Sequence, residues 1–562
     1  MLVSSLFYVT FPKTGEPFTI CRMTGRARHP LIIGARVTSL GTFCSRLLGM
    51  LRDMATAALL GLSGGGVMDA FVIAFRIPNL FRQLFGEGAL AASYLPVLSA
   101  QLEKDRAAAW QLVSVALTWL AVLLVVLVLV AEGACGLAWL AWGDVPGVGL
   151  VVGLAAVMMP YLLFICLAAQ VAATLHAIAH FGTPALVPAV LNVCWLVGAL
   201  VVAPHFAPDR EAQAYVLAVS VLVAGVLQLG VQLPVLRALG FRFDYDWAAS
   251  RAAIYQIVGA MGPMVLGLAI TQINTISDSL IAWGMAAVPG GPDRIAWLGG
   301  AASYPMEQGA VAAIYYGARL YQFPLGVLGM AVATAIFPLL SRHAARGDHG
   351  KLGADMTLGL RLVLFLGVPA GVGLILLAEP LARLLFEHGR FTAEDTARTA
   401  RMIATYAGGV WAYCAVPVLV RGYYALSDRT TPVRVGLAVV GLNLGLNLVL
   451  IWPFAEAGLA VATAVSAGVQ ASLLALLFSR RKSRLDWPVL GATTVRTVLS
   501  TLLMAAAVVA TLAVIPQVHG LLNELARVFG PVVAGVGVFL AAYRLLGGRE
   551  LGILLRGVDE QS

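Results

Sequence analysis

Arginines stand inside apolar stretches of this chain, where a charged side chain is costly. The apolar run at 33–60 contains Arg46 and Arg52, with Ser45 and Asp53 beside them. An arginine near the bilayer centre costs from about 3 to more than 10 kcal/mol unless it faces water, an anion or a partner. Because the guanidinium group stays charged and donates paired hydrogen bonds, it is suited to phosphate. The pattern therefore predicts a binding site for a phosphate or diphosphate.

A second apolar stretch carries a polar stripe. Four of its residues recur at steps of seven, seven and four, which return close to one azimuth of a helix. They are Asp69, Arg76, Gln83 and Glu87. We expect this face to line a hydrated interior, with Asn79 as a further candidate contact. Arg82 lies off the stripe, so it either widens the polar surface or pairs elsewhere.

A third stretch adds Arg319, with Tyr315 and Gln322 one helical turn to either side. A competing interpretation is that all these charges form buried ion pairs that fix helix packing. That interpretation suits the acidic residues, which can balance arginines. The concentration of central arginines in only three stretches favours a ligand site instead.

The composition of the chain indicates which kind of structural element positions these residues. Of the 562 residues, 60% are hydrophobic and 12% are charged, and the mean hydropathy is +0.88. Soluble domains carry about 25% charged residues, so we expect an all-α integral membrane protein. Continuous apolar runs argue against a β-barrel. The runs predict about fourteen transmembrane helices, at 33–60, 67–99, 109–131, 148–178, 184–203, 212–236, 252–285, 308–340, 358–380, 400–426, 433–452, 456–478, 492–515 and 525–546.

The net charge of +9 is concentrated in loops on one side of these helices. Cytoplasmic loops are enriched in Lys and Arg, so both termini are predicted to be cytoplasmic and nucleic acid is not an expected partner. Short matches at nearly equal spacing, Pro96 with Pro338 and Pro184 with Pro432, suggest two six-helix halves around a central cavity. Chance similarity between apolar segments is the alternative. The predicted parts are a tail (1–32), two lobes (33–236 and 252–478) joined by a linker (237–251), a basic loop (479–491), two added helices (492–546) and a second tail (547–562).

The residues from Ser45 to Asp53, from Asp69 to Ala89 and from Tyr315 to Val327 resemble the MurJ (MviN) family of lipid II flippases. The resemblance covers about 34 to 485. It implies a fourteen-helix exporter of the MOP superfamily in the bacterial inner membrane that flips lipid II outward by alternating access. Its functional positions map onto Arg46, Arg52, Asp69, Arg82, Glu87 and Arg319, whose arginines would bind the diphosphate and flanking acidic groups. The two last helices would form a groove for the undecaprenyl tail.

Two departures from the family pattern are present. Ala318 stands where many relatives have Asp, and Gln83 where many have a second arginine. The loop from Gly284 to Gln308 is also long, and we expect a disordered insertion there, with a periplasmic lid as the alternative.

Some relatives have a sodium site, and the matching candidates here are Asp278, Asn443, Asn447 and Thr463. All four offer oxygen ligands, but they include a single carboxylate, and buried amides more often bond neighbouring helices. No ATPase, zinc or nucleophile motif is found, so we expect a transporter without enzymatic activity or cofactor. A Na⁺ or H⁺ gradient or the membrane potential would supply the energy.

Three rival functions remain open. One is a flippase for another polyprenyl-diphosphate-linked glycan, and another is a MATE-like antiporter, whose cationic drugs the arginines would repel. The third is a membrane scaffold that recruits cell-wall synthesis proteins. We expect a monomer whose partners are lipid II and the bilayer, with cell-wall synthesis proteins as further candidate partners.

Overall fold

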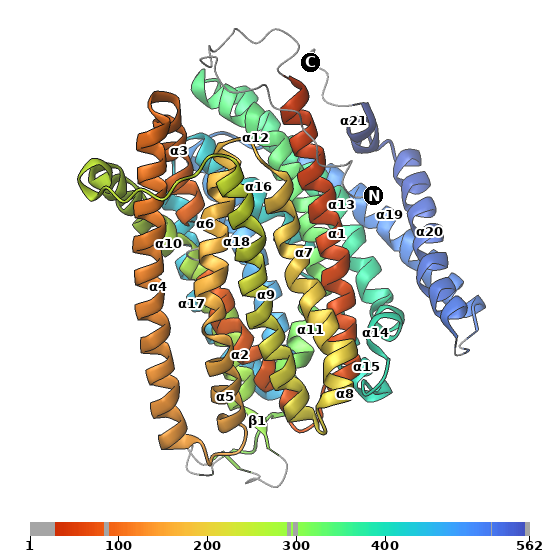
Figure 1. The fold of residues 1–562 in the computed structure, drawn as a ribbon. Helices are drawn as coiled ribbons and strands as arrows, with labels where there is room; N and C mark the ends of the chain where they lie inside the picture. The colour runs from red at the N-terminus through yellow and green to blue at the C-terminus, as the bar shows by residue number, and fades with distance from the viewer. Residues whose placement is uncertain are drawn as a thin grey trace. The chain divides into compact units, whose positions relative to one another are not determined.

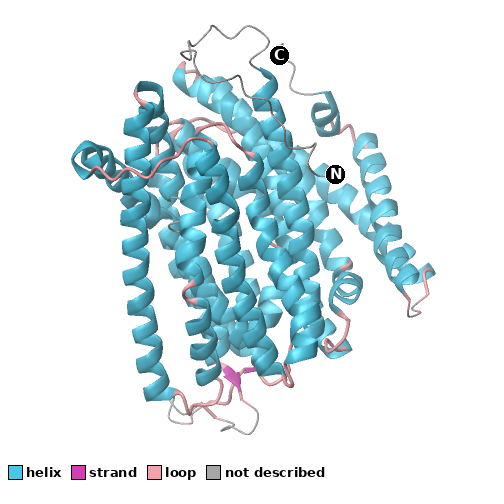
Figure 2. Ribbon diagram, viewed as in Figure 1, coloured by secondary structure: helices cyan, strands magenta, loops and turns pink. Residues whose placement is uncertain are grey.

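The computed structural model describes residues 28–83, 89–288, 294–295, 300, 302–516, 518 and 520–556. Nearly all of them lie in helices, which confirms the all-α membrane fold (Figures 1 and 2). Within these ranges, ten helices are long and apolar enough to cross a membrane, or eleven if one bent pair counts as a span. Every one of the predicted stretches contains a described helix, and the total of about fourteen spans stays a prediction.

The chain divides into two compact units. The N-terminal unit comprises the described residues up to Ala55 together with Ala74–Ala269, and the C-terminal unit comprises Thr56–Ile73 and the described chain from Ile270 onward. The helices α1 (Arg28–Leu60) and α2 (Val67–Phe81) therefore contribute residues to both units. The division falls inside α10 (Trp247–Gly284), and the two predicted six-helix lobes stay a prediction.

The N-terminal unit packs around apolar side chains from several helices. Its further helices are α3 (Ala89–Lys104), α4 (Arg106–Trp142), α5 (Val148–Met158), α6 (Tyr161–Ala177), α7 (Gly182–Val197), the π turn η2 (Gly198–Val202), α8 (Ala203–Phe206) and α9 (Arg210–Ala238). Tyr94, Trp110 and Val171 lie in one buried cluster that joins α3, α4 and α6. The hydroxyl groups of Tyr94 and Thr174 lie 3.0 Å apart, so a polar contact between α3 and α6 accompanies the apolar packing.

The C-terminal unit is also helical. Its elements are α11 (Ala310–Pro324), η4 (Leu325–Gly329), α12 (Met330–Ala345), α13 (His349–Leu376), α14 (Ala378–Phe386), α15 (Ala393–Ala407), α16 (Val410–Ala425), α17 (Thr430–Phe454), α18 (Glu456–Arg481), α19 (Trp487–Val514), α20 (Leu521–Leu545) and α21 (Glu550–Arg556). One buried apolar core is shared by α12, α13, α16 and α18. It contains Ile336, Val363, Val418 and Leu474.

Two breaks in these helices have sequence causes. Pro324 ends α11, and because proline lacks a backbone N–H, the regular ladder gives way to the π turn η4. The helices α15 and α16 are bent by 43° at Gly408 and Gly409. The polar half, α15, is thus turned away from the apolar half, and it carries the buried charges described below.

The loop from Gly284 to Gln308 contains ordered structure in its described part. The strand β1 (Ala286–Ala287) pairs in parallel with β2 (Met306–Glu307), and a bridge joins Arg294 to Ser303. The expectation of a disordered insertion is therefore wrong for these described residues.

The two added helices, α19 and α20, pack on each other and on α13. Phe365 of α13 lies in a buried cluster with Met504 and Val508 of α19 and Phe539 and Tyr543 of α20. The ring of Phe365 is 4.6 Å from that of Tyr543. These helices are therefore an integral part of the C-terminal unit, and the lipid-tail groove stays a prediction.

Candidate functional site

Arg52, on α1 in the N-terminal unit, is buried with its countercharge beside it. Its guanidinium group donates to Oδ1 of Asp53 at 2.8 and 3.1 Å, and to Oδ1 of Asn192 at 3.1 Å. It also lies 4.6 Å from the ring centre of Trp195, in a cation–π contact. Only 8% of Arg52 is exposed, so neutralisation by Asp53 offsets the cost of burying the charge.

Asn192 and Trp195, both on α7, hold this arginine in place. The amide of Asn192 donates to the backbone oxygen of Ser45 at 3.0 Å, while its oxygen accepts from Arg52. Phe75 of α2 packs edge-on against Trp195 at 5.1 Å. Sequence analysis missed both α7 residues, because an Asn and a Trp in an apolar helix carry no spacing signal that links them to α1.

Arg46 differs from Arg52 in its surroundings. It is exposed on α1, and no described residue pairs with it. Ser45, beside it, is half-buried and near the Asn192 amide, at 3.4 Å. Arg46 is thus a guanidinium group on an apolar helix that is open to an anionic ligand.

At the end of α2 the structure brings together Asn79 and Arg82, which follows the last residue of that helix. The Oδ1 atom of Asn79 accepts from Nε and Nη2 of Arg82 at 3.0 and 2.8 Å. Of the two roles predicted for Arg82, the structure thus shows pairing, with a residue three positions earlier in the chain. Arg76 is half-buried on the same helix, and Glu87 lies outside the described residues.

Asp69, at the start of α2, belongs to the C-terminal unit and binds the beginning of α11. Its two carboxylate oxygens accept from the backbone N–H groups of Gly309 and Ala312 at 2.7 and 2.8 Å. Backbone N–H groups at a helix start have no partner within the helix and attract negative charge. These contacts assign Asp69 a structural role, and its contact with a ligand stays a prediction.

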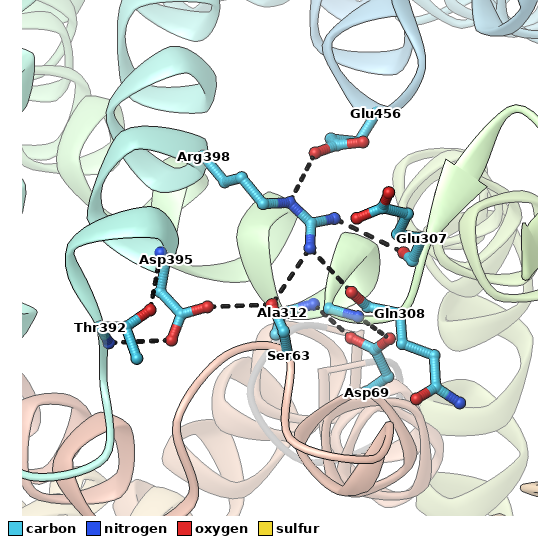
Figure 3. A network of polar contacts seen from close by, with 10 residues as sticks. Ser63, Asp69, Glu307, Gln308, Ala312, Thr392, Asp395, Arg398 and Glu456 are labelled. Carbon is cyan, nitrogen blue, oxygen red and sulfur yellow. Dashed lines mark hydrogen bonds and ion pairs between the residues drawn. The ribbon is translucent and has the colours of Figure 1, made fainter. Parts of the chain in front are cut away.

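Arg398 of α15 is the centre of a buried polar network near Asp69, shown in Figure 3. Its Nε donates to Glu456 at 3.1 Å, and its Nη1 donates to the Ser63 hydroxyl at 3.1 Å and the Gln308 carbonyl at 2.8 Å. Asp395 accepts from the same Ser63 hydroxyl at 2.9 Å. We call these residues the Arg398 network. It ties the turn between α1 and α2 to the starts of α11, α15 and α18.

The sequence contains one local signal for this network. Thr392 and Asp395 form a capping box at the start of α15, with their reciprocal bonds at 3.2 and 3.0 Å. A Thr followed three residues later by an acidic residue is the sequence signature of that motif. The distant partners Ser63 and Glu456 have no such local signature.

Arg319 of α11, in the C-terminal unit, is partly buried and held by an aromatic neighbour. Its Nη2 donates to the hydroxyl of Tyr315 at 2.5 Å, and its guanidinium carbon lies 4.5 Å from the Tyr315 ring centre. The predicted one-turn spacing of Tyr315 and Arg319 thus produces a direct contact. Stacking on this ring limits the positions that the guanidinium group can adopt.

The four candidate sodium ligands lie together in the C-terminal unit. The amide nitrogen of Asn447 donates to Asp278 at 2.6 Å and to Asn443 at 3.1 Å, and Asn443 donates to Thr463 at 3.5 Å. These are the residues that the family resemblance suggested as ligands, and their use as a cation site stays a prediction.

Comparison with known proteins gives consistent matches. A family model described as "Lipid II flippase MurJ" matches residues 56–530. A "Probable lipid II flippase MurJ" of Vibrio cholerae serotype O1 is 32% identical over 455 residues, which are 78% of this chain and 81% of that relative. A "Lipid II flippase MurJ" of Burkholderia cenocepacia is 31% identical and covers 78% of this chain and 82% of its own length.

Solved structures share the fold. A structure titled "Lipid II flippase MurJ, inward closed conformation" superposes with a TM-score of 0.71 at 22% identity, covering 90% of this chain and 98% of that one. An inward-facing MATE family transporter of the MOP superfamily gives 0.61 at 13% identity, covering 80% and 95%. At these identities the likeness concerns the fold alone.

Proposed function

This chain belongs to the lipid II flippase MurJ family, and from that premise we propose that it carries lipid II across the bilayer. The lipid's diphosphate-linked sugar-peptide head would pass from the cytoplasmic to the outer leaflet by alternating access between two lobes. The observation that carries the proposal is the presence of arginines on apolar helices, with Arg46 exposed and Arg319 held by Tyr315.

The arginines would act in different ways. Arg46 offers a guanidinium group to which no described residue is bound, so it can meet a phosphate directly. Arg52 already binds Asp53, and a diphosphate would compete with that carboxylate for the same donors. Such competition would keep lipid binding weak enough for release, because Asp53 can pair with Arg52 again when the lipid leaves.

Orientation and energy supply belong to the proposal as well. We place both termini in the cytoplasm of a multi-pass inner membrane protein, from the positive loops on one side. The protein would act as a monomer and draw on an ion gradient or the membrane potential. Contacts with cell-wall synthesis proteins would follow from its place in the same membrane.

Complementation tests the proposal. In a bacterium depleted of its own flippase, the wild-type chain should restore growth and the exposure of lipid II on the outer membrane face. Exposure can be measured with an impermeant enzyme that cleaves lipid II. The variants R46A, R52A and R319A should be inserted normally and fail. The matched control is R434A, which removes an exposed arginine at the start of α17 and should support growth. Normal growth with all three variants would refute the assigned site.

The same assay separates the rival substrates. A flippase for another polyprenyl-diphosphate-linked glycan would leave lipid II inside while exposing that glycan lipid. A MATE-like antiporter would expose neither. The likeness to MATE transporters concerns the fold, and the arginines speak against cationic drugs.

A further inference from the structure

The cluster at Asp278 is a continuous chain of hydrogen bonds buried between α10, α17 and α18. Asn443 and Asn447 are 1% and 0% exposed, and Asp278 is 6% exposed. The amide nitrogen of Asn447 donates to Asp278, at 2.6 Å, and to Asn443. The amide nitrogen of Asn443 in turn donates to the hydroxyl of Thr463, which donates to the carbonyl of Leu459 at 3.0 Å.

The orientation of the Asn447 amide is fixed by its neighbours. A carboxylate has only acceptor atoms, so the group that faces Asp278 at 2.6 Å must be the donor NH₂. If the amide were turned over, its oxygen would face the acceptor oxygens of Asp278 and Asn443. That arrangement would be repulsive unless a cation lay among the three oxygens.

The same geometry decides whether sodium fits. A cation site needs the oxygens of Asp278, Asn443 and Thr463 to point at a shared position. Here each of these residues has an oxygen that accepts an N–H group from another member of the cluster. The NH₂ group of Asn447 stands between Asp278 and Asn443, where a cation would have to be. The buried Oδ1 atom of Asn447 accepts no hydrogen bond from a described residue, but the oxygens that would have to bind a cation already accept N–H groups. The residues therefore fit an internal hydrogen-bond chain and not a sodium ion.

We propose that the Asn447 amide takes the place of a coupling cation, so that this cluster joins α10 to α17 and α18 without sodium. One N–H group of this amide donates to the single carboxylate of Asp278, and the other donates to Asn443. Transport by this chain then draws on no sodium gradient at this site. The inference does not depend on which lipid is carried.

Replacing the donor should create the missing cation requirement. In Asn447→Asp the side chain keeps its size, loses both N–H groups and adds a second carboxylate close to Asp278. The two ionised groups repel each other, and a cation relieves the repulsion. A ligand that binds only the folded state stabilises it, so sodium should raise the Tm of this variant by at least about 3 °C.

The experiment compares thermal unfolding of the purified full chain in NaCl, KCl and choline chloride at equal ionic strength. It is run at mildly alkaline pH, where free carboxyl groups are ionised. The wild type should have the same Tm in all three salts, and N447D should be stabilised by sodium. The matched control is the swapped pair D278N/N447D, which restores one amide and one carboxylate and should again show no preference among the salts.

Two results would overturn the proposal. One is a saturable, sodium-specific rise in the Tm of the wild type, which would show that the amide yields its place to the ion. The other is a folded N447D that does not respond to sodium. If N447D cannot be purified in any salt, the wild type and the swapped pair still decide, because sodium stabilisation of either one contradicts the inference. Flipping activity is not part of this readout, so failure of the proposed function would leave it unaffected.

Discussion

Glu550 offers a sharp test of how the last helices are attached. This residue begins α21, is fully buried, and accepts hydrogen bonds from three surrounding side chains. Arg361 of α13 donates at 2.7 and 2.9 Å, Thr493 of α19 donates at 3.0 Å, and Tyr543 of α20 donates at 2.6 Å. One carboxylate thus joins α13, α19 and α20.

The substitution E550Q should break this attachment without changing the volume of the side chain. Removing one partner of a buried ion pair costs about 3 to 5 kcal/mol, because the other charge is left uncompensated. Arg361 is still 20% exposed at its side chain, and water can offset part of that cost, so we expect about 2 to 3 kcal/mol. The loss should appear as a lower Tm and as faster hydrogen exchange in residues 543–556.

The dependence on pH has a definite sign. Burial alone would raise the pKa of Glu550, but hydrogen bonds from Tyr543 and Arg361 lower it to about 2. A lowered pKa in the folded state means that the contribution is present above the unfolded pKa, about 4.3, and is lost as pH falls toward 2. The wild type should lose this contribution in that window, and E550Q should not.

The double variant R361Q/E550Q is the control. It removes both charges, so it should be at least as stable as E550Q alone. The substitution Y543F, which removes one hydrogen bond, should cost about 1 kcal/mol. An E550Q protein with wild-type Tm and wild-type exchange in residues 543–556 would refute this account of the attachment.

Three further predictions concern other charged residues. D69N should lower stability by about 1 kcal/mol in thermal unfolding, because an amide replaces the charge at the start of α11 and only one of its atoms can accept; an unchanged Tm would contradict this. R398M should lower the free energy of unfolding by about 3 kcal/mol, because Glu456 is left buried without its partner. The double variant R398M/E456Q should recover part of the Tm, and no recovery would argue against the ion pair. Burial alone would raise the pKa of Asp428, but Lys482 and Thr431 lower it to about 2. The wild type should therefore lose the stability contribution of this carboxylate only as pH falls below about 4, and D428N should lack that contribution at every pH. Equal acid unfolding curves for the two proteins would contradict this prediction.

The class of fold can be predicted from the sequence, whereas its long-range polar contacts cannot. Hydropathy located the helices because apolar runs of sufficient length determine membrane spans by themselves. The contact of Tyr315 with Arg319, four residues apart, also follows from helical spacing. The partners of Arg398 do not, since Ser63 lies 335 residues away and Gln308 lies 90 residues away. Such contacts depend on tertiary packing, which no local pattern encodes.

The polar stripe on α2 shows where periodicity was insufficient. Spacing placed Asp69 and Arg76 on one helical face, and both are on α2 as expected. Yet Asp69 lies in the C-terminal unit and Arg76 in the N-terminal one. The carboxylate of Asp69 accepts hydrogen bonds from backbone N–H groups at the start of α11. No side-chain pattern in α2 could indicate this contact.

The central claim is that arginines on the apolar helices bind the diphosphate of a lipid, and binding of purified lipid II to the purified chain tests it most directly. Each charge-assisted contact is worth about 1.5 to 3 kcal/mol, so R46A and R319A should each weaken binding by about 10- to 100-fold while R434A leaves it unchanged. Equal affinity of R46A, R319A and the wild type for lipid II would contradict the account.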